Sequence, residues 1–175
     1  MHKTIGILFI VAALVAIPVI VYAEKSKAGA AGSSGANTAS TTITSMSQNN
    51  NPTSIVYDPK DFPNMVSQYN GIGVFDTLQN GVLGAEQNAN AKFTEGYRIL
   101  QDFANIWSNN SPGYANTLLQ YVQQAPIFNG VPLSVNSDIS YVSQDLNSMA
   151  WLIAGITVAE GTNPLSQQTV LNLIS

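Results

Sequence analysis

The chain has 175 residues, of which 45% are apolar and only 9% charged, with a net charge of −4. This apolar fraction suffices for one packed core, but the surface must be covered mainly by Asn, Gln, Ser and Thr. Only three cations, Lys60, Lys92 and Arg98, follow residue 55, which argues against nucleic-acid binding. The absence of cysteine excludes disulfides, thiolate metal sites and thiol catalysis.

Residues 1–23 predict an export signal or a membrane anchor. Lys3 precedes an uncharged apolar run over residues 5–23. Val21 and Ala23 suit the positions before a signal-peptidase site, so cleavage after Ala23 is one interpretation. As a helix the same run would extend about 28 Å, close to the ~30 Å hydrocarbon core, so an uncleaved anchor is the alternative. Both interpretations, the cleaved signal and the uncleaved anchor, place the rest of the chain outside the inner membrane, in the periplasm or at the cell surface.

Residues 24–53 predict a flexible linker. The segment consists mainly of Ala, Gly, Ser, Thr and Asn and has almost no large apolar side chains. It therefore buries too little surface to offset the conformational entropy lost on ordering. Two interpretations remain open: a spacer that holds a domain away from a membrane or an assembly, and a disordered mature N-terminus. The folded domain is predicted at 54–175.

The domain is expected to start with a short extended segment and a short helix. Residues 55–57 are β-prone and should lie against the bundle. Pro59 turns the chain, and Pro63 fits the first turn of a helix over residues 64–69. The Asn70-Gly71 step breaks that helix.

A long amphipathic helix is predicted from Ile72 to Trp107. Apolar residues recur there every three or four positions over about nine turns. Arg98 and Asp102 are four residues apart, which predicts an ion pair on the helix surface. The apolar stripe consists of Phe75, Leu78, Val82, Ala85, Ala89, Phe93, Tyr97, Leu100, Phe103 and Trp107.

Three further helices complete the predicted fold. The second should run over residues 112–124, because Pro112 suits a first helical position. A turn-rich loop follows, and the third helix should begin near Ser137 and stop before Gly161. A last short helix follows Asn163. The predicted fold class is all-α: an antiparallel bundle of three main helices with short N- and C-terminal helices.

Few residues are available for catalysis. His2 is the only histidine and lies in the leader, so the sequence offers no Ser-His-Asp triad and no histidine metal site. Glu86, Glu95 and Glu160 are the candidates for acid catalysis in a cell-wall lytic enzyme, which needs a shielded carboxyl group. Glu160 is the best of them, at a helix end among apolar neighbours. A solvated carboxylate is the favoured interpretation.

Metal and nucleotide sites are also unsupported. Asp58 and Asp61 have no third or fourth carboxylate nearby, so helix capping is favoured over calcium binding. No glycine-rich phosphate loop follows a strand. We therefore predict that the protein is not an enzyme and has no cofactor, metal or small-molecule substrate.

Protein partners are the predicted ligands. Trp107 and Tyr114 flank a turn at one end of the bundle, and aromatic residues are enriched at interfaces. Ile127, Phe128 and Val131 lie in the turn-rich loop, where they could cover the bundle or contact a partner. These five residues are the predicted partner-binding site. The apolar run at 5–23 would contact the membrane if it is not cleaved.

The segment IVYDPKDFPNMVSQ, between an apolar leader and an amphipathic helix, resembles the minor pilus subunits of type IV secretion systems, the TrbJ-like conjugal transfer proteins. The resemblance implies a helical, non-enzymatic, exported subunit that acts through protein contacts near a pilus tip. The order of elements extends the resemblance over most of the chain. The matching letters are Val56, Tyr57, Asp58, Pro59, Phe62 and Asn64.

The expected function is that of an exported, non-enzymatic structural subunit, a minor pilus or assembly component of a type IV secretion apparatus used in conjugation. The first alternative is a membrane-anchored structural protein of a virus or a surface layer. The second is a cell-wall lytic enzyme that uses Glu160.

Overall fold

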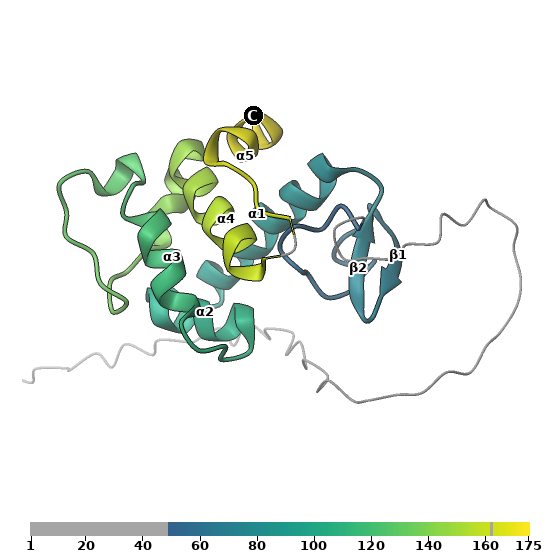
Figure 1. Ribbon diagram of the computed structural model, residues 1–175, viewed down its shortest axis with the longest axis horizontal. Helices are drawn as coiled ribbons and strands as arrows, with labels where there is room; N and C mark the ends of the chain where they lie inside the picture. The colour runs from purple at the N-terminus through teal and green to yellow at the C-terminus, as the bar shows by residue number, and fades with distance from the viewer. Residues whose placement is uncertain (1–48, 162) are drawn as a thin grey trace, which may run out of the picture. The chain divides into compact units, whose positions relative to one another are not determined.

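The computed structural model describes residues 49–161 and 163–175 (Figure 1). The predicted leader at 1–23 and residues 24–48 of the predicted linker lie outside these ranges. Within them, no helix is both long and apolar enough to cross a membrane. The elements, in chain order, are β1 Met65–Tyr69, β2 Ile72–Phe75, α1 Leu78–Thr94, α2 Leu100–Ser108, α3 Tyr114–Val122, η2 Pro126–Phe128, η3 Ser140–Gln144, α4 Leu146–Glu160 and α5 Gln167–Ile174, where η denotes a 3₁₀ helix.

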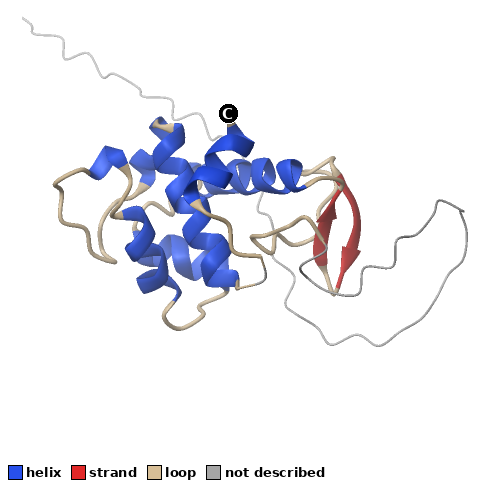
Figure 2. Cartoon of the chain, turned by 45° about the horizontal axis from the view of Figure 1, so that its top comes forward, coloured by secondary structure: helices blue, strands red, loops and turns tan. Residues whose placement is uncertain are grey.

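The domain contains a β-hairpin, so the prediction of an all-α antiparallel bundle is wrong. β1 and β2 pair antiparallel through a two-residue turn, Asn70-Gly71 (Figure 2). The φ angles of Asn70 and Gly71 are 52° and 81°. Two positive φ values define a type I′ turn, which Asn-Gly adopts readily and which matches the twist of paired strands. The residues predicted as a short helix over 64–69 are therefore mostly strand, because the Asn-Gly step joins two strands.

Residues 49–57, which we call the strap, run along the other edge of β2. The Gly73 N–H donates to the Ile55 carbonyl at 2.9 Å, and the Phe75 N–H donates to the Asn49 carbonyl at 3.0 Å. Val56 also forms an isolated bridge with Ile72. The strap thus acts as an irregular third strand. The predicted boundary between linker and domain, at residues 53 and 54, falls inside this packed segment.

Asparagine side chains complete the hydrogen bonding of the strap. Asn51 is only 1% exposed, and its amide donates to the carbonyls of Ile55 at 2.8 Å and Gly73 at 3.0 Å. Its Oδ1 accepts from the Ile55 N–H at 3.0 Å. Asn50 donates from its amide to the Phe75 carbonyl at 3.1 Å. These amides satisfy backbone groups that a regular strand would pair, so the segment can be buried without orphaned polar atoms.

Two glycines in α1 allow the strap and the hairpin to pack closely on this helix. A Cβ atom at Gly81 would lie 1.7 Å from the carbonyl oxygen of Asn50. A Cβ atom at Gly84 would lie 2.7 Å from Cζ of Phe75. Both distances are shorter than any normal contact, so a side chain at either position would displace the neighbouring element.

The long helix predicted from Ile72 to Trp107 is divided into three elements. Its first four residues form β2, and a link separates the end of α1 from the start of α2. Gly96 in this link has φ +102°, a conformation that ends a right-handed helix. Ile99 in the same link forms a bridge with Asp138. The apolar period continues across the link, which explains why periodicity alone predicted one helix.

The predicted ion pair between Arg98 and Asp102 does not form, because Arg98 lies in the link and Asp102 on α2. Among the described residues the only ion pair joins Lys92 Nζ to Glu95 Oε2, at 2.8 Å. Lys92 is 4% exposed and lies in the last turn of α1.

The helices after α2 are also shorter than predicted. The third main helix, α4, begins at Leu146 instead of near Ser137, and η3 occupies much of the intervening segment. Asp145 caps α4, because its carboxylate accepts from the Ser148 N–H at 2.9 Å. The last helix, α5, is capped by Ser166.

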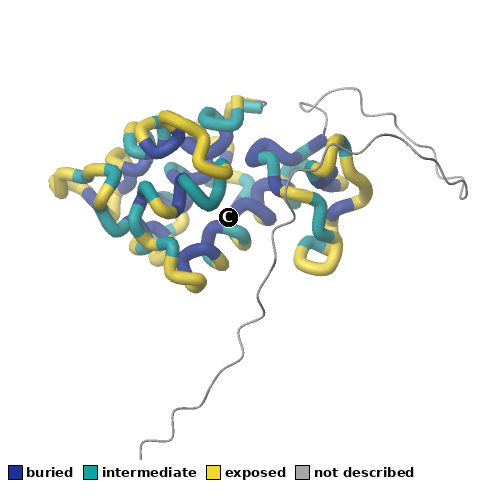
Figure 3. The backbone as a smooth tube through the Cα atoms, turned by 90° about the horizontal axis from the view of Figure 1, so that it is seen from below, coloured by how far each residue is buried: buried dark blue, intermediate teal, exposed yellow. Residues whose placement is uncertain are grey.

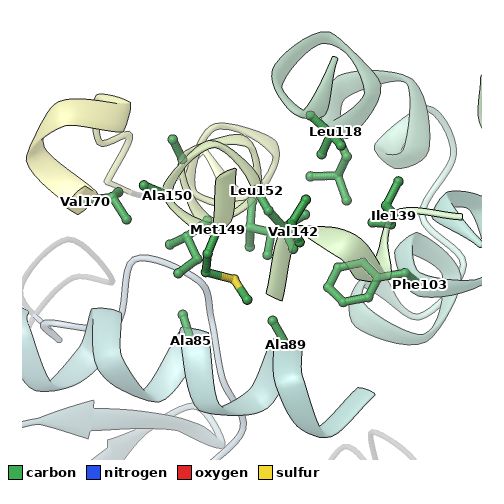
Figure 4. Close-up of a cluster of buried hydrophobic side chains, with 14 of the residues drawn as sticks. Ala85, Ala89, Phe103, Leu118, Ile139, Val142, Met149, Ala150, Leu152 and Val170 are labelled. Atoms are coloured by element: carbon green, nitrogen blue, oxygen red, sulfur yellow. The ribbon is translucent and has the colours of Figure 1, made fainter. Parts of the chain in front are cut away.

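The core is centred on α4, where nine of 15 residues are buried. Such a helix is apolar on more than one face because neighbours cover it from several sides. It packs against α3, α5 and α1, and most buried residues belong to these helices (Figure 3). Met149 of α4 points toward Ala85 and Ala89 of α1, where small side chains leave room for it (Figure 4).

Candidate functional site

The segment between α3 and α4 forms a groove that is open to solvent. Its volume is about 410 Å³. The segment is the green loop that projects beyond α3 in Figure 1. The residues that line the groove are Ile127, Phe128, Val131, Pro132, Leu133, Ser137, Asp138 and Tyr141.

Backbone hydrogen bonds fix the far side of this loop to the start of α2. The Gln101 N–H donates to the Val135 carbonyl at 2.8 Å, and the Leu100 N–H donates to the Ser137 carbonyl at 3.0 Å. In the opposite direction, the Ile139 N–H donates to the Arg98 carbonyl at 2.9 Å. The loop therefore uses the first N–H groups of a helix, which have no partner within that helix. Although it contains little regular secondary structure, it is held at several points.

The near side of the loop is held by α4. Phe128 is buried against the core and anchors η2. The Ile127 N–H donates to Ser148 Oγ at 3.2 Å, and this hydroxyl donates to the Asp145 carboxylate at 2.5 Å. The hydrogen bonds from Ser148 lower the pKa of Asp145. The cap of α4 and the base of the groove thus share one hydroxyl group.

The groove lining is mostly apolar and includes the polar residues Ser137 and Asp138, and the Asp138 carboxylate is already hydrogen-bonded. Asp138 Oδ1 accepts from the Ser140 N–H at 2.9 Å and from its hydroxyl at 2.7 Å. The rim carries large apolar side chains in water: Ile127 is 39% exposed, Val131 55% and Tyr141 50%. This arrangement can bind an apolar group and orient it with a few polar atoms.

The structure brings together three of the five predicted partner-binding residues, Ile127, Phe128 and Val131, in this groove. Trp107 and Tyr114 lie elsewhere. Trp107 stacks on a neighbouring phenylalanine of α2 at 5.4 Å between ring centroids, and its Nε1 donates to the strap carbonyl of residue 53 at 3.4 Å. Tyr114 is buried.

The prediction did not select Tyr141 for the partner-binding site. A signal was present, because the helical spacing of Ile139, Val142 and Leu146 places this aromatic residue on another side of the helix predicted to begin near Ser137. A large aromatic ring on the polar side of a predicted helix indicates an exposed contact residue. In the structure Tyr141 belongs to η3 and lines the groove.

The candidate acids for catalysis do not share a site. Glu86 is on α1, where burial raises its pKa, Glu95 follows α1, and Glu160 ends α4. Glu160 Oε1 accepts a hydrogen bond from the Tyr114 hydroxyl at 2.9 Å. Burial, the charge of Glu160 and this hydrogen bond together raise the pKa of Tyr114. The pair links the start of α3 to the end of α4.

Asp58, one of the two residues considered for calcium binding, caps a turn instead. Asp58 Oδ1 accepts from the N–H groups of Lys60 at 3.0 Å and Asp61 at 3.4 Å, as in an Asx turn. Within residues 49–161 and 163–175, no three His, Cys, Asp or Glu side chains lie close enough together to hold a metal ion.

Comparison of the chain with protein-family models, with curated proteins and with solved structures finds no match. The groove is therefore interpreted from its own geometry and from the sequence.

Proposed function

We propose that this protein is an exported, non-enzymatic subunit of a larger assembly and that the groove binds an apolar segment of a partner protein. The observation that carries the proposal is a loop fixed from both sides that nevertheless leaves Ile127, Val131 and Tyr141 in water. A folded domain has no need to hold apolar side chains in such a position, so we assign them a ligand.

The energetics support a binding role. Complete burial of a large apolar side chain contributes about 1.5–3 kcal/mol, so three partly exposed ones can provide a useful part of a micromolar affinity. The backbone bonds to α2 and the Ser148 hydroxyl order the loop before binding, which reduces the entropy lost in the complex. Tyr141 has the amphipathic ring that is common among energetically dominant interface residues.

The cellular role we propose is that of a minor pilus or assembly component of a type IV secretion apparatus. It is supported by the apolar leader and by the resemblance of the segment from Val56 to Asn64 to TrbJ-like proteins. A membrane-anchored structural protein of a virus or a surface layer is the second candidate. It is supported by the length of the apolar run at 5–23, which matches a bilayer.

Complementation of a deletion strain tests this proposal. Deletion should abolish DNA transfer or pilus assembly without affecting growth, and the full chain should restore both. Val131→Asp should fail to restore them because it places a charge in the groove. Val66→Asp is the matched control, since Val66 is 63% exposed on β1 and should tolerate the charge.

Each result has one meaning. Normal transfer in the deletion strain eliminates the secretion assignment, and full complementation by Val131→Asp eliminates the groove as the binding site. Mass spectrometry of the mature protein separates the two cellular roles. A new N-terminus at Glu24 supports the exported subunit, whereas an intact Met1 supports the anchored one.

A further inference from the structure

The charge around the groove has one sign. From residue 99 to residue 175 the sequence contains four acidic residues and no lysine, arginine or histidine. Three of these acids belong to the segments that build the groove. Asp138 lines it, Asp145 accepts from the hydroxyl group at its base, and Asp102 follows the residue that anchors the loop to α2. A partner that binds here therefore meets negative charge beside apolar side chains.

The nearest cation along the chain, Arg98, does not neutralise this charge by direct contact. Its carbonyl accepts from the Ile139 N–H, next to Asp138, but its side chain is exposed. The only ion pair in the part of the chain that the structure describes joins Lys92 to Glu95, at the end of α1. The groove thus keeps a net negative charge that a partner can complement.

Polar atoms that have no partner lie next to the apolar rim. Both hydrogen bonds from Ser140 go to Oδ1 of Asp138, and no described residue donates to Oδ2. Leu133 lines the groove, and within residues 49–161 and 163–175 neither its N–H nor its carbonyl group is hydrogen-bonded. Because buried polar groups are almost always paired, these atoms contact water and can bind a ligand. A peptide can use all of them, since it carries backbone donors and acceptors as well as side chains.

We propose that the occupant of the groove is a basic apolar segment, a short stretch of a partner protein in which a lysine or arginine adjoins large apolar side chains. This inference rests on the proposed function and adds the chemistry of the partner. The apolar side chains of the segment pack against Ile127, Val131 and Tyr141. Its cation binds Oδ2 of Asp138 in a charge-assisted hydrogen bond, and its backbone pairs with Leu133. An acidic segment with the same apolar residues is rejected, because it meets like charges.

Two synthetic peptides test this proposal on the immobilised full chain by surface plasmon resonance. Both contain the core Leu-Ile-Val and have blocked ends, but one carries a lysine on each side of the core and the other a glutamate. The wild type should bind the lysine peptide at least about fivefold more tightly, as expected for an ion pair near the surface. Because both peptides are compared on the wild type, this result does not depend on the folding of a variant.

Two matched substitutions locate the preference for the lysine peptide. Asp138→Asn should remove most of it, because the amide keeps an oxygen for the bonds from Ser140 but carries no charge. Asp61→Asn removes the same charge from an exposed turn before β1 and should preserve the preference. If Asp61→Asn reduces the preference as much as Asp138→Asn does, the effect comes from net charge and the proposal is wrong.

Tyr141→Ala separates this inference from the proposed function. If the wild type binds both peptides equally and Tyr141→Ala weakens both, the groove still binds an apolar segment, but the inference about charge is overturned. If neither peptide binds, or if Tyr141→Ala has no effect, the groove is not the binding site and the proposed function fails as well. Binding of free copies of the same chain that Tyr141→Ala abolishes would overturn the proposal in favour of a second copy as the occupant.

Discussion

The bundle of α3, α4 and α5 and the strap with its hairpin are stabilised in different ways. In the bundle, apolar side chains such as Leu118, Leu152 and Val170 fill the space between helices. In the strap, asparagine amides bond to backbone carbonyls, and glycines allow backbone to approach within contact distance of other backbone. The stability of the bundle therefore depends on how well side chains fill its interior. The stability of the strap depends on individual hydrogen bonds and close backbone contacts.

This difference determines how each region responds to mutation. Apolar packing can adjust, because side chains change rotamer and helices shift slightly against each other. A buried backbone carbonyl cannot move away from an added methyl group without breaking the hydrogen bonds of its own segment. Small changes should therefore be more destabilising in the strap than in the bundle.

The largest expected effect comes from Gly81→Ala. Its Cβ atom would lie 1.7 Å from the Asn50 carbonyl oxygen, so the strap must leave α1. We expect a loss of about 3 kcal/mol or more in the free energy of unfolding, even though alanine favours a helix by up to ~1 kcal/mol. Urea denaturation monitored by circular dichroism measures this loss of stability.

Gly155→Ala is the matched control in the bundle. Its Cβ atom would meet Tyr121 Cβ at 2.9 Å and Cγ at 3.2 Å. A Cβ atom moves only with its own backbone, so α3 and α4 must shift slightly apart, which costs about 1–3 kcal/mol before the gain in helix propensity. The expected loss is therefore smaller than that for Gly81→Ala. If both alanines are equally tolerated, the distinction between the two regions is wrong.

Asn51→Ala should have the second-largest effect. It removes two amide donors and one acceptor from a residue that is 1% exposed, and leaves the carbonyls of Ile55 and Gly73 without these donors. At about 1 kcal/mol for each bond, the expected loss is about 2–3 kcal/mol. Asn129→Ala is the control, because Asn129 is exposed in the groove loop. A loss below that of the control would show that water replaces the amide.

The same contrast explains what the sequence could predict of the fold. The period of apolar residues located α3, α4 and α5 approximately, because packing against a core imposes that period. It could not distinguish a strand at Ile72–Phe75 from a first helical turn, since both strands are short. The Asn70-Gly71 step carried the missing information, as the strongest short-range signal for a hairpin. Our prediction instead places the end of a short helix at this step.

The candidate groove was partly predictable for a related reason. A turn-rich loop with Ile127, Phe128 and Val131 indicated apolar side chains outside a helix. The anchoring of that loop to α2 and to Ser148 depends on contacts between distant segments, which periodicity does not encode. Tyr114 was selected for its place next to a turn, but the register of α3 directs its ring into the bundle, toward Glu160.

The smallest expected effect comes from Tyr114→Phe in the bundle. It removes the hydrogen bond to Glu160 and keeps the ring, so the loss at neutral pH should be about 1 kcal/mol. Because burial, with the charge of Glu160, raises the pKa of Tyr114 above its ordinary value of 10.0, the unfolded chain loses this proton first as the pH rises. The wild type should therefore lose stability above about pH 10, while the variant loses less there and the difference between them narrows. Denaturation curves at neutral and alkaline pH measure the free energy of unfolding of the wild type and the variant. If the difference between the two proteins is the same at both pH values, the phenol is not protected from water, and this part of the bundle packs as loosely as a surface.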